Sequence, residues 1–587
     1  MRRIYFLSIV ILLYNTISYS FNGETNTVTS ICKSEEYSLQ ESNSQDLLYN
    51  DNLSGRIVWN ERYFMESLIN IYEATKDRRY IEIFIRHADH VLSVRDDATR
   101  SLDFMGRRRP GWQTGGYYTL GIPRLIKDIE GLPSLEIRAI HNAGNGNTSI
   151  AVTEGSGKDF NIVIYNDFRA DKRVVQKFYN LNMDIVESLI NESLSPESWI
   201  HVKKLGLNPP SPGIYHLEET CRMVLHELHT PLIGIPFLRF AALVFEETEL
   251  QVYNEKAAAY VTAFEESYRD YKDSWREDKD GGYFVFEPGG CYWASGLPVP
   301  YNGLSANGRF LLWLYMVTGR MEYLEKSVKL AKKIRAGMEI LPDGTLLMPY
   351  WYGLPFSGWQ DRVSNPVNGI YIKSNAYNGP EDVSHFRSTL QYMVDAYKMG
   401  VIFDDNVMIA ASNTFLKRVW KLTGKKEEVK WGRDFYNIFL ERFKKTGLGH
   451  KKKDPKDYGY LAQDIAGRGQ ANNNGAWIFA RLGKWNADIE TKVLKAYYPL
   501  FLDSDKIDID YEYGAFLLGL SILVLNGENG ISSVPLYPFT PRASSENYIK
   551  MNKRYHLDEA GILYVEYGKS YSEIGKRYNP GLSLIHI

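Results

Sequence analysis

A helix–turn–helix unit that occurs more than once constrains the fold of this chain more than any other feature. Two segments, 66–89 and 310–332, match in character along their length. In both, apolar residues at helical spacing give each helix one buried stripe. A single hairpin cannot bury such stripes, so the copies must stack on one another. The matched residues are Leu68 with Leu311, Ile71 with Leu314, Tyr72 with Tyr315, Thr75 with Thr318, Tyr80 with Tyr323 and Ala88 with Ala331.

The rest of the chain supplies enough helices to close such a stack into a ring. A weaker third copy of the unit, FLKRVWKLTGKKEEV, covers 415–429. Together the hairpins predict a mainly α fold, an (α/α)6-7 toroid, with an open helical solenoid as the alternative. Further helical stretches are predicted at 216–247, 251–276, 381–423, 431–447, 472–500 and 510–526.

One segment breaks the helical pattern. Between 135 and 205, short runs of alternating apolar and polar residues are separated by turns rich in Gly, Asn and Asp, which is typical of strands. We therefore expect a β-rich insertion at 135–205, between the first hairpins (21–134) and the remainder of the toroid (206–530). The last segment, 531–587, is predicted to be an irregular C-terminal extension.

The first twenty residues are typical of an export signal. Arg2 and Arg3 precede an apolar run over 4–14, and Ser18 and Ser20 are small residues of the kind found at signal-peptidase sites. The apolar run is too short to cross a bilayer, which takes ~20 residues. We expect cleavage after Ser20, a secreted or periplasmic protein, and no membrane span.

Charge, cysteine and aromatic content narrow the function further. The net charge of −2 argues against nucleic acid as a partner, because neutralising phosphates takes clustered cations. The three cysteines cannot form a disulfide framework; Cys221 and Cys291 are the candidate pair, and we expect both to be buried thiols. The 42 tyrosines and 12 tryptophans favour a carbohydrate ligand, since sugar rings stack on aromatic faces.

The strongest candidate site is NGPEDVSH, residues 378–385, which opens a predicted helix. Glu381 and His385 are four residues apart, so they share one face of that helix. With Asp382 they offer carboxylates and an imidazole for proton transfer or substrate binding. The alternative is that the acids cap the helix, where its dipole favours negative charge, and that His385 packs in the core.

Two aromatic-rich loops, at 347–371 and 287–309, each come before a predicted helix. Aromatic rings beside a guanidinium suit an acidic sugar, through stacking and bidentate pairing to its carboxylate. The alternative for the first loop is a buried aromatic plug. In the second loop, a Tyr near a cleft can donate or accept a proton when a nearby cation lowers its pKa. The candidates are Tyr350, Trp351, Tyr352, Trp359, Asp361 and Arg362 in the first loop, and Tyr292, Tyr301 and Asn302 in the second.

The N-terminal part adds Trp59, Glu61 and Trp112 as candidate substrate-binding residues, in aromatic and charged segments of the same kind. His226 and His229 fall short of the zinc motif H-E-x-x-H, because HELH places its histidines three residues apart. We therefore expect no metal site and no cofactor, and an assisting calcium ion is left open.

The hairpin L-x-x-L-Y-x-x-T-G-x-x-x-Y-L, followed by aromatic loops and the EDVSH helix, resembles the six-hairpin α/α-toroid carbohydrate-active enzymes. That group includes polysaccharide lyases, hydrolases and the C-terminal domain of glucuronyl C5-epimerases. The resemblance covers residues 56–526 apart from the insertion, and it assigns no single family. It implies a polysaccharide or oligosaccharide substrate, while the oligomeric state has no signal in the sequence.

Two mechanisms compete within that group. A lyase or epimerase binds a uronic carboxylate and removes the proton at C5, whereas a hydrolase needs two carboxylates beside the glycosidic bond. The surplus of Tyr, Arg and His favours the first, with the hydrolase as the alternative and a non-catalytic glycan-binding toroid as a third. For a lyase the resemblance implies His385, Tyr350 or Tyr301 in proton transfer and Arg362, Asn302 or Glu381 at the carboxylate; for a hydrolase, Glu381 or Asp382 with Asp361 or Glu61.

Overall fold

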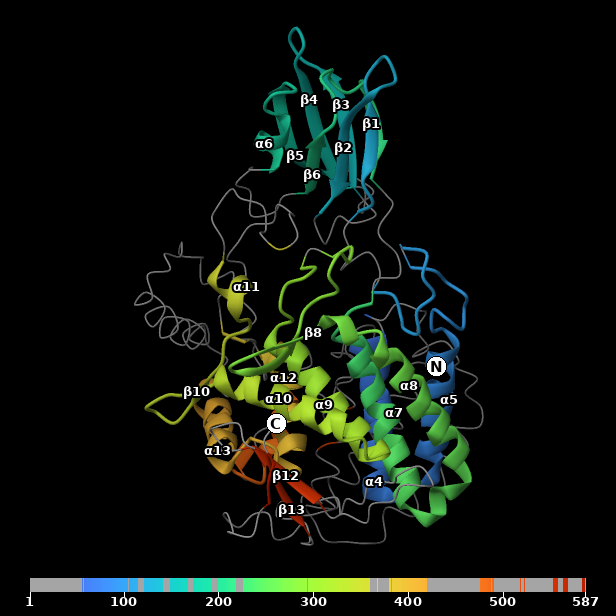
Figure 1. Cartoon of the computed structure of the whole chain (residues 1–587), viewed down its shortest axis with the longest axis vertical. Coiled ribbons are helices and arrows are strands. Elements are labelled where there is room, and N and C mark those ends of the chain that lie inside the picture. The colour runs from blue at the N-terminus through green and yellow to red at the C-terminus, as the bar shows by residue number, and fades with distance from the viewer. Residues whose placement is uncertain are drawn as a thin grey trace, which may run out of the picture.

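A computed structural model gives the fold, and Figure 1 shows helices at one end of the molecule and a strand-rich unit at the other. The structure describes residues 55, 57–103, 105–114, 121–140, 148–166, 173–191, 199–217, 225–292, 294–358, 367, 380–381, 383–419, 476–486, 488–489, 518, 522, 553–557, 563–567 and 583–585.

The helical part is built from successive hairpins whose first helices pack side by side. α7 packs on α4 and α9, α12 packs on α9, and η7 (Ala476–Leu482) packs on α12. α7 and α9 are buried along nearly their whole length, whereas α8 and α10 bury one face. The first helices therefore form an inner layer. The hairpins are α4 (Arg62–Thr75) with α5 (Arg78–Ser93), α7 (His229–Glu246) with α8 (Asn254–Arg269), α9 (Tyr301–Thr318) with α10 (Met321–Ala336), and α12 (Val383–Lys398) followed by α13 (Asp405–Thr414).

This layering confirms the prediction of a mainly helical chain built from hairpins. Closing the inner layer into a ring requires hairpins from the C-terminal third of the chain. The helices predicted at 431–447 and 510–526, and most of the third repeat copy, lie outside the described residues. Closure into a toroid therefore stays a prediction.

The turn inside the repeated unit has the same structure in both copies. The hydroxyl groups of Thr75 and Thr318 donate to the carbonyl four residues earlier, at 2.8 and 2.6 Å. The next residue, Lys76 or Gly319, has a left-handed backbone, and its N–H returns to the carbonyl four residues before it. This is a common way to end a helix, and it explains why the Thr-Lys and Thr-Gly pairs recur.

Three predicted helices have different limits in the structure. The one predicted at 216–247 begins only at His229, because the residues up to His216 pair as strand β7 with β3. The one predicted at 251–276 ends at Arg269, and the chain continues into a short hairpin. The one predicted at 381–423 is interrupted at Gly400, whose φ of +71° helps turn the chain between α12 and α13. The short elements are η1 (Ile57–Glu61), η2 (Thr248–Tyr253), η3 (Lys272–Ser274), β8 (Trp275–Asp278), β9 (Gly281–Phe284), β10 (Glu339–Ile340), β11 (Leu346–Leu347), α11 (Gly353–Ser357) and η4 (Phe415–Val419).

The strand-rich unit consists of two antiparallel sheets with a core of their own. One sheet has the order β1-β2-β6 and the other the order β5-β4-β3-β7. Alternate apolar residues, such as Ile137, Ile150 and Ile162, fill a core separate from that of the helices. The strands extend beyond the predicted limits of 135–205 on both sides. The elements are β1 (Arg124–Lys127), β2 (Pro133–Ala139), β3 (Thr148–Glu154), β4 (Phe160–Asn166), β5 (Arg173–Leu181), α6 (Val186–Asn191), β6 (Ile200–Lys204) and β7 (Gly213–His216).

Two further expectations need correction. The C-terminal segment predicted to be irregular contains a three-stranded antiparallel sheet, β12 (Lys553–Leu557), β13 (Leu563–Tyr567) and β14 (Ser583–Ile585). Cys291 is disulfide-bonded rather than a free thiol, and Arg138 Nη2 of β2 donates to its sulfur at 3.4 Å. The other cysteines lie outside the described residues.

Within the part of the chain that the structure describes, no helix combines the length and the apolar character needed to cross a bilayer.

Gly308 lies where α9 approaches α12 closely. A Cβ atom there would stand 2.4 Å from Tyr392 Cζ, and Tyr392 has no room to move because it is buried and its hydroxyl donates to the Ser327 carbonyl at 2.6 Å. We expect Gly308→Ala to lower the free energy of unfolding by about 1–3 kcal/mol, since overpacking outweighs the better helix propensity of alanine. Urea denaturation measures this, with Glu255→Ala on the exposed face of α8 as the control. A Gly308→Ala protein as stable as wild type would contradict the close packing of these helices.

Candidate functional site

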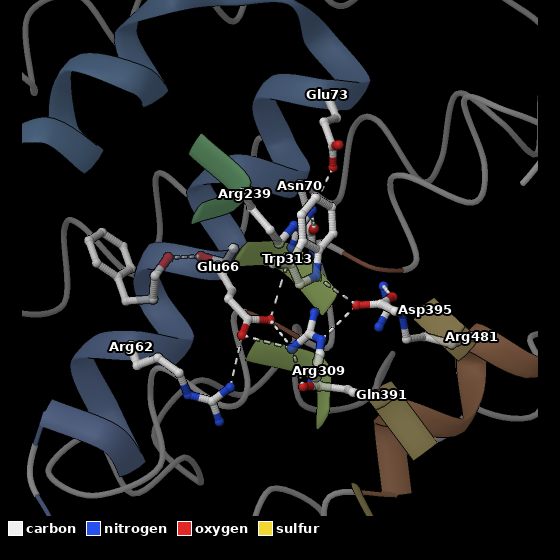
Figure 2. A network of polar contacts seen from close by, with 12 residues as sticks. Arg62, Glu66, Asn70, Glu73, Arg239, Arg309, Trp313, Gln391, Asp395 and Arg481 are labelled. Carbon is white, nitrogen blue, oxygen red and sulfur yellow. Dashed lines mark hydrogen bonds and ion pairs between the residues drawn. The ribbon is translucent and has the colours of Figure 1, made fainter. Parts of the chain in front are cut away.

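A buried network of charged side chains joins the inner helices along the axis between them (Figure 2). At its centre, Glu66 of α4 accepts hydrogen bonds from Arg62 Nη1 (2.8 Å) and from Arg309 Nη1 of α9 (3.1 Å). Glu66 and Arg309 are each 1% exposed. Burial alone would raise the pKa of Glu66, but the surrounding arginines, Arg309 foremost, outweigh it and hold that pKa below its usual value.

Asp395 of α12 is a second acid in this network. It accepts hydrogen bonds from Arg309 Nε (2.7 Å) and Trp313 Nε1 (3.1 Å), and it pairs with Arg481 Nη2 of η7 at 3.3 Å. Burial opposes the charged form, yet Arg309 and Arg481 prevail and lower the pKa of Asp395. One carboxylate thus links α9, α12 and η7.

The network carries more positive than negative charge. Arg239 of α7 donates to Asn70 Oδ1 (2.8 Å) and to Glu73 Oε2 (2.7 Å) of α4. Among the described residues, the four arginines drawn in Figure 2 face three carboxylates. Within this described part of the network, the arginines therefore outnumber the carboxylates. The arginines are Arg62, Arg239, Arg309 and Arg481, and the acids are Glu66, Glu73 and Asp395.

The same contacts show that neighbouring inner helices run parallel. Ser305 of α9 donates to Thr389 of α12 at 3.2 Å, and two turns further on Trp313 meets Asp395. The N-terminal ends of the inner helices therefore gather at one end of the layer, which we call the rim. The rim consists of the described residues 57–63, 225–229, 284–292, 294–302, 348–352, 380–381 and 383–389.

The rim brings the first predicted site and the preceding aromatic loop together. Tyr350 packs against His385, with 4.7 Å between the ring centroids. The N–H of Glu381 donates to the Met348 carbonyl at 2.9 Å, and its carboxylate accepts from the hydroxyl of Thr389 at 3.0 Å. Residues from two predicted candidates thus form one side of the rim.

The other side of the rim is aromatic and carries two histidines. His226 and His229 stack with 4.4 Å between their centroids. Trp59 lies edge-on to His229 at 5.9 Å, and Tyr292 lies 5.6 Å from His226. Trp59 and Tyr292 are half-buried, as are Tyr350 and His385, so part of each side chain is accessible to a ligand.

Several predicted residues are buried instead. Trp112 is 0% exposed, its indole N–H donates to the Val91 carbonyl (2.8 Å), and its ring stacks on Phe264. Burial leaves such side chains little surface for a ligand, so they hold the rim in place. The Glu61 carboxylate is hydrogen-bonded to His87 Nδ1 at 2.9 Å, and Trp351 Nε1 donates to the Pro298 carbonyl at 2.6 Å. The buried group comprises Glu61, Trp112, Tyr301, Asn302 and Trp351.

The tyrosines next to this group are poorly suited to act as bases. The rings of Tyr301 and Tyr352 lie 4.7 Å apart. Burial raises the pKa of both hydroxyl groups far above the usual value. Each therefore keeps its proton at neutral pH, which disfavours the proton-abstracting role that the resemblance implied for Tyr301.

Three of the predicted site residues, Trp359, Arg362 and Asp382, lie outside the described residues, as does Asp361.

Sequence reasoning missed Glu227, which stands between the two histidines of HELH. Glu227 is 2% exposed, and its carboxyl group accepts the backbone N–H of Glu287. Burial outweighs this hydrogen bond and raises the pKa of Glu227 to about 8. A protonated carboxylic acid therefore stands at the rim at neutral pH. No local pattern signals it, because the segment that covers it lies sixty residues further along the chain.

The two histidines beside Glu227 are neutral at physiological pH. Burial lowers the pKa of His226 to about 3 and that of His229 well below its usual value. Neutral imidazoles are potential metal ligands. Among the residues that the structure describes, however, no three His, Cys, Asp or Glu side chains are grouped so that they could hold a metal ion.

Glu227 should make stability depend on pH. Its pKa is about 8 in the folded protein against an ordinary value of 4.5, so between these pH values the folded state keeps a proton that the unfolded state has lost. Stability from this group therefore falls as pH rises, by up to about 1.4 kcal/mol per pH unit. Glu227→Gln cannot ionise, so we expect its stability relative to wild type to increase from pH 5 to pH 8 in urea titrations at several pH values. A constant difference across this range would contradict the raised pKa.

Comparisons with known proteins assign no family. No protein-family model and no curated protein matches the chain. A solved structure that matches is a family 76 glycoside hydrolase from a bovine Bacteroides thetaiotaomicron strain, with 9% identity and a TM-score of 0.23, over 70% of this chain and 98% of that chain. A similarity of this size supports no inference about fold or function.

Proposed function

We propose that this protein is an enzyme that hydrolyses glycosidic bonds of a polysaccharide or oligosaccharide at the rim. The observation that carries the proposal is the buried carboxyl group of Glu227, with a pKa of about 8, beside partly accessible aromatic rings. A carboxylic acid that stays protonated at neutral pH is what a glycosidase needs to protonate the departing sugar oxygen. The tyrosines with raised pKa values, by contrast, do not favour β-elimination.

In the proposed reaction Glu227 is the general acid and Glu381 is the second carboxylate. The two lie on either side of the first turns of α9: the Glu227 carbonyl accepts from Asn307 (2.8 Å), and Thr389 links Glu381 to Ser305. The second carboxylate either activates water or attacks the sugar. Because Glu227 is buried and its carboxyl group accepts the backbone N–H of Glu287, the segment around Glu287 must shift when a sugar enters.

The sugar rings of the substrate would stack on the exposed parts of Trp59, Tyr292 and Tyr350. Aromatic side chains at a binding site supply contact area at low entropic cost, and their polar tips hydrogen-bond to hydroxyl groups. The proposed chemistry needs only water and these side chains, without a cofactor.

We also propose that the chain is exported, by the predicted signal at 1–20. The disulfide at Cys291 supports this location, because disulfides form and persist mainly in oxidising compartments.

The test is to incubate the purified protein with a panel of polysaccharides and to measure new reducing ends together with ultraviolet absorbance of unsaturated uronic products. Reducing ends without the absorbance support hydrolysis. The contact between Tyr350 and His385 favours β-elimination as the second candidate, and it predicts the absorbance. If neither signal arises on any polymer, the proposed hydrolysis is wrong and the protein acts as a glycan binder or on another class of substrate.

A further inference from the structure

Arg387 lies on the second turn of α12, at the rim, and sequence reasoning did not select it. Its guanidinium lies over the Tyr63 ring at 4.7 Å and over the Trp59 ring at 5.4 Å. Cation–π contacts of this kind hold a guanidinium in place without neutralising its charge. Tyr63 lies in the first turn of α4 and Trp59 lies in η1 just before it, so Arg387 is held between α12 and the start of α4.

The charge of Arg387 is unused within the described residues. The guanidinium makes no ion pair there, and its Nε is buried without a hydrogen-bond partner. Three arginines of the axial network behave differently, because Arg62, Arg239 and Arg309 each bind a carboxylate. A half-buried cation without a counter-charge costs free energy unless a ligand supplies one.

Two further features make this place attractive to an anion. The helices α7, α9 and α12 point their N-terminal ends, the positive ends of their dipoles, at the rim. Towards the C-terminal end of α12 from Arg387, the described part of the axial network has four arginines against three carboxylates. Among the described acids of the rim, Glu227 is protonated and Glu287 pairs with Arg107 and Arg109, Glu61 is hydrogen-bonded to His87, and Glu381 accepts from Thr389.

From these contacts we infer that Arg387 binds an oxyanion carried by the substrate, so the glycan is an acidic one. The inference rests on the proposed function and adds the class of its substrate. A planar guanidinium pairs with a carboxylate or a sulfate through two parallel hydrogen bonds. The Trp59 ring lies next to this guanidinium. One sugar unit would therefore pair its anionic group with Arg387 and stack its ring on Trp59.

The experiment measures the affinity of the full chain by calorimetry for oligosaccharides of equal length that are neutral, uronic or sulfated. We expect wild type to bind one charged class about tenfold or more tightly than the neutral one, with a preference that shrinks as salt is added. Arg387→Gln should lose this preference and keep its affinity for the neutral oligosaccharide. Arg86→Gln, which removes an exposed arginine from α5, is the matched control and should keep the preference.

The outcomes separate this inference from the proposed function. If wild type shows no preference, or if Arg387→Gln and Arg86→Gln keep it equally, the inference is wrong while hydrolysis of neutral glycan stands. Arg387→Lys keeps the charge over the rings but not the planar pair, so it should keep only part of the preference; this variant serves if the glutamine variant unfolds. If no glycan is bound or cleaved, both proposals are wrong. Preference for the uronic or for the sulfated oligosaccharide identifies the oxyanion.

Discussion

Replacing Glu66 by alanine is expected to lower the free energy of unfolding by about 3–5 kcal/mol, which is a large part of the stability of a typical domain. The carboxylate accepts from Arg62 and Arg309, with Arg239 4.0 Å away. Removing it leaves Arg62 buried without its counter-charge, while Arg309 keeps only Asp395 and Arg239 only Glu73. Urea denaturation at neutral pH measures the effect.

The control for Glu66→Ala is a salt bridge that is exposed. Glu277 pairs with Lys329 at 2.9 Å, and both side chains are partly exposed, so Glu277→Ala should cost less than about 1 kcal/mol. A double variant, Glu66→Leu with Arg309→Met, should recover part of the lost stability, because it removes charge of both signs. A cost below about 1 kcal/mol for Glu66→Ala would mean that the inner helices are not held together by this network.

Acid pH should act on the same network. The pKa of Glu66 and that of Asp395 are held below their usual values by the arginines, against the effect of burial. The stability that these carboxylates supply is therefore present above their unfolded pKa values. It is lost as pH falls through the lower, folded values.

Glu227→Gln is expected to reduce hydrolysis of a natural glycan by about 100- to 10,000-fold, the usual contribution of a general acid. Glutamine keeps the size of the side chain and loses the transferable proton. In wild type, activity should decline as pH rises past about 8, because Glu227 then ionises, and this limb of the profile should vanish in the variant. The measurement is the rate of reducing-end release as a function of pH.

Substrates with different leaving groups make the test of Glu227 specific. An aryl glycoside whose leaving group departs without protonation should be cleaved by Glu227→Gln with a much smaller loss than the natural glycan. Glu255→Gln, on the exposed face of α8, is the matched control and should behave like wild type on both substrates. Equal losses on both substrates would assign Glu227 a structural role instead.

The hairpins could be predicted from the sequence because their signals are local. Thr75 and Thr318 precede the residue that turns left-handed, and apolar spacing marks the faces on either side. The start of α7 could not be placed, since β7 depends on pairing with β3, more than sixty residues earlier in the chain. Non-local pairing of this kind leaves no periodic trace at the residues concerned.

The burial of polar residues on the inner face of α4 could not be predicted from the sequence either. Glu66, Asn70 and Glu73 recur at helical spacing on α4, and such a polar stripe is typical of a solvated face. This stripe is buried because α7 and α9 bring Arg239 and Arg309 to it from elsewhere in the chain.

The sequence predicted which segments form the candidate site, but it did not predict which of their residues are accessible. The segments around Tyr350, Glu381 and Trp59 do meet at the rim. Composition could not tell an accessible ring such as Trp59 from a buried one such as Trp112. Nor could it find Glu227, whose raised pKa depends on burial by a segment distant in the sequence.

The axial network also sets an order for biosynthesis. Arg309 leaves the ribosome 243 residues after Glu66, and Asp395 follows 86 residues after Arg309. Before Arg309 has been synthesised, Glu66 in the first hairpin lacks its main counter-charge. The inner face of this hairpin is then more stable in water than packed against other helices. Fragments that stop before Arg309 should therefore be targets for proteases and chaperones. The strand-rich unit, by contrast, has its whole core within a continuous stretch of chain and can complete itself while translation is still under way.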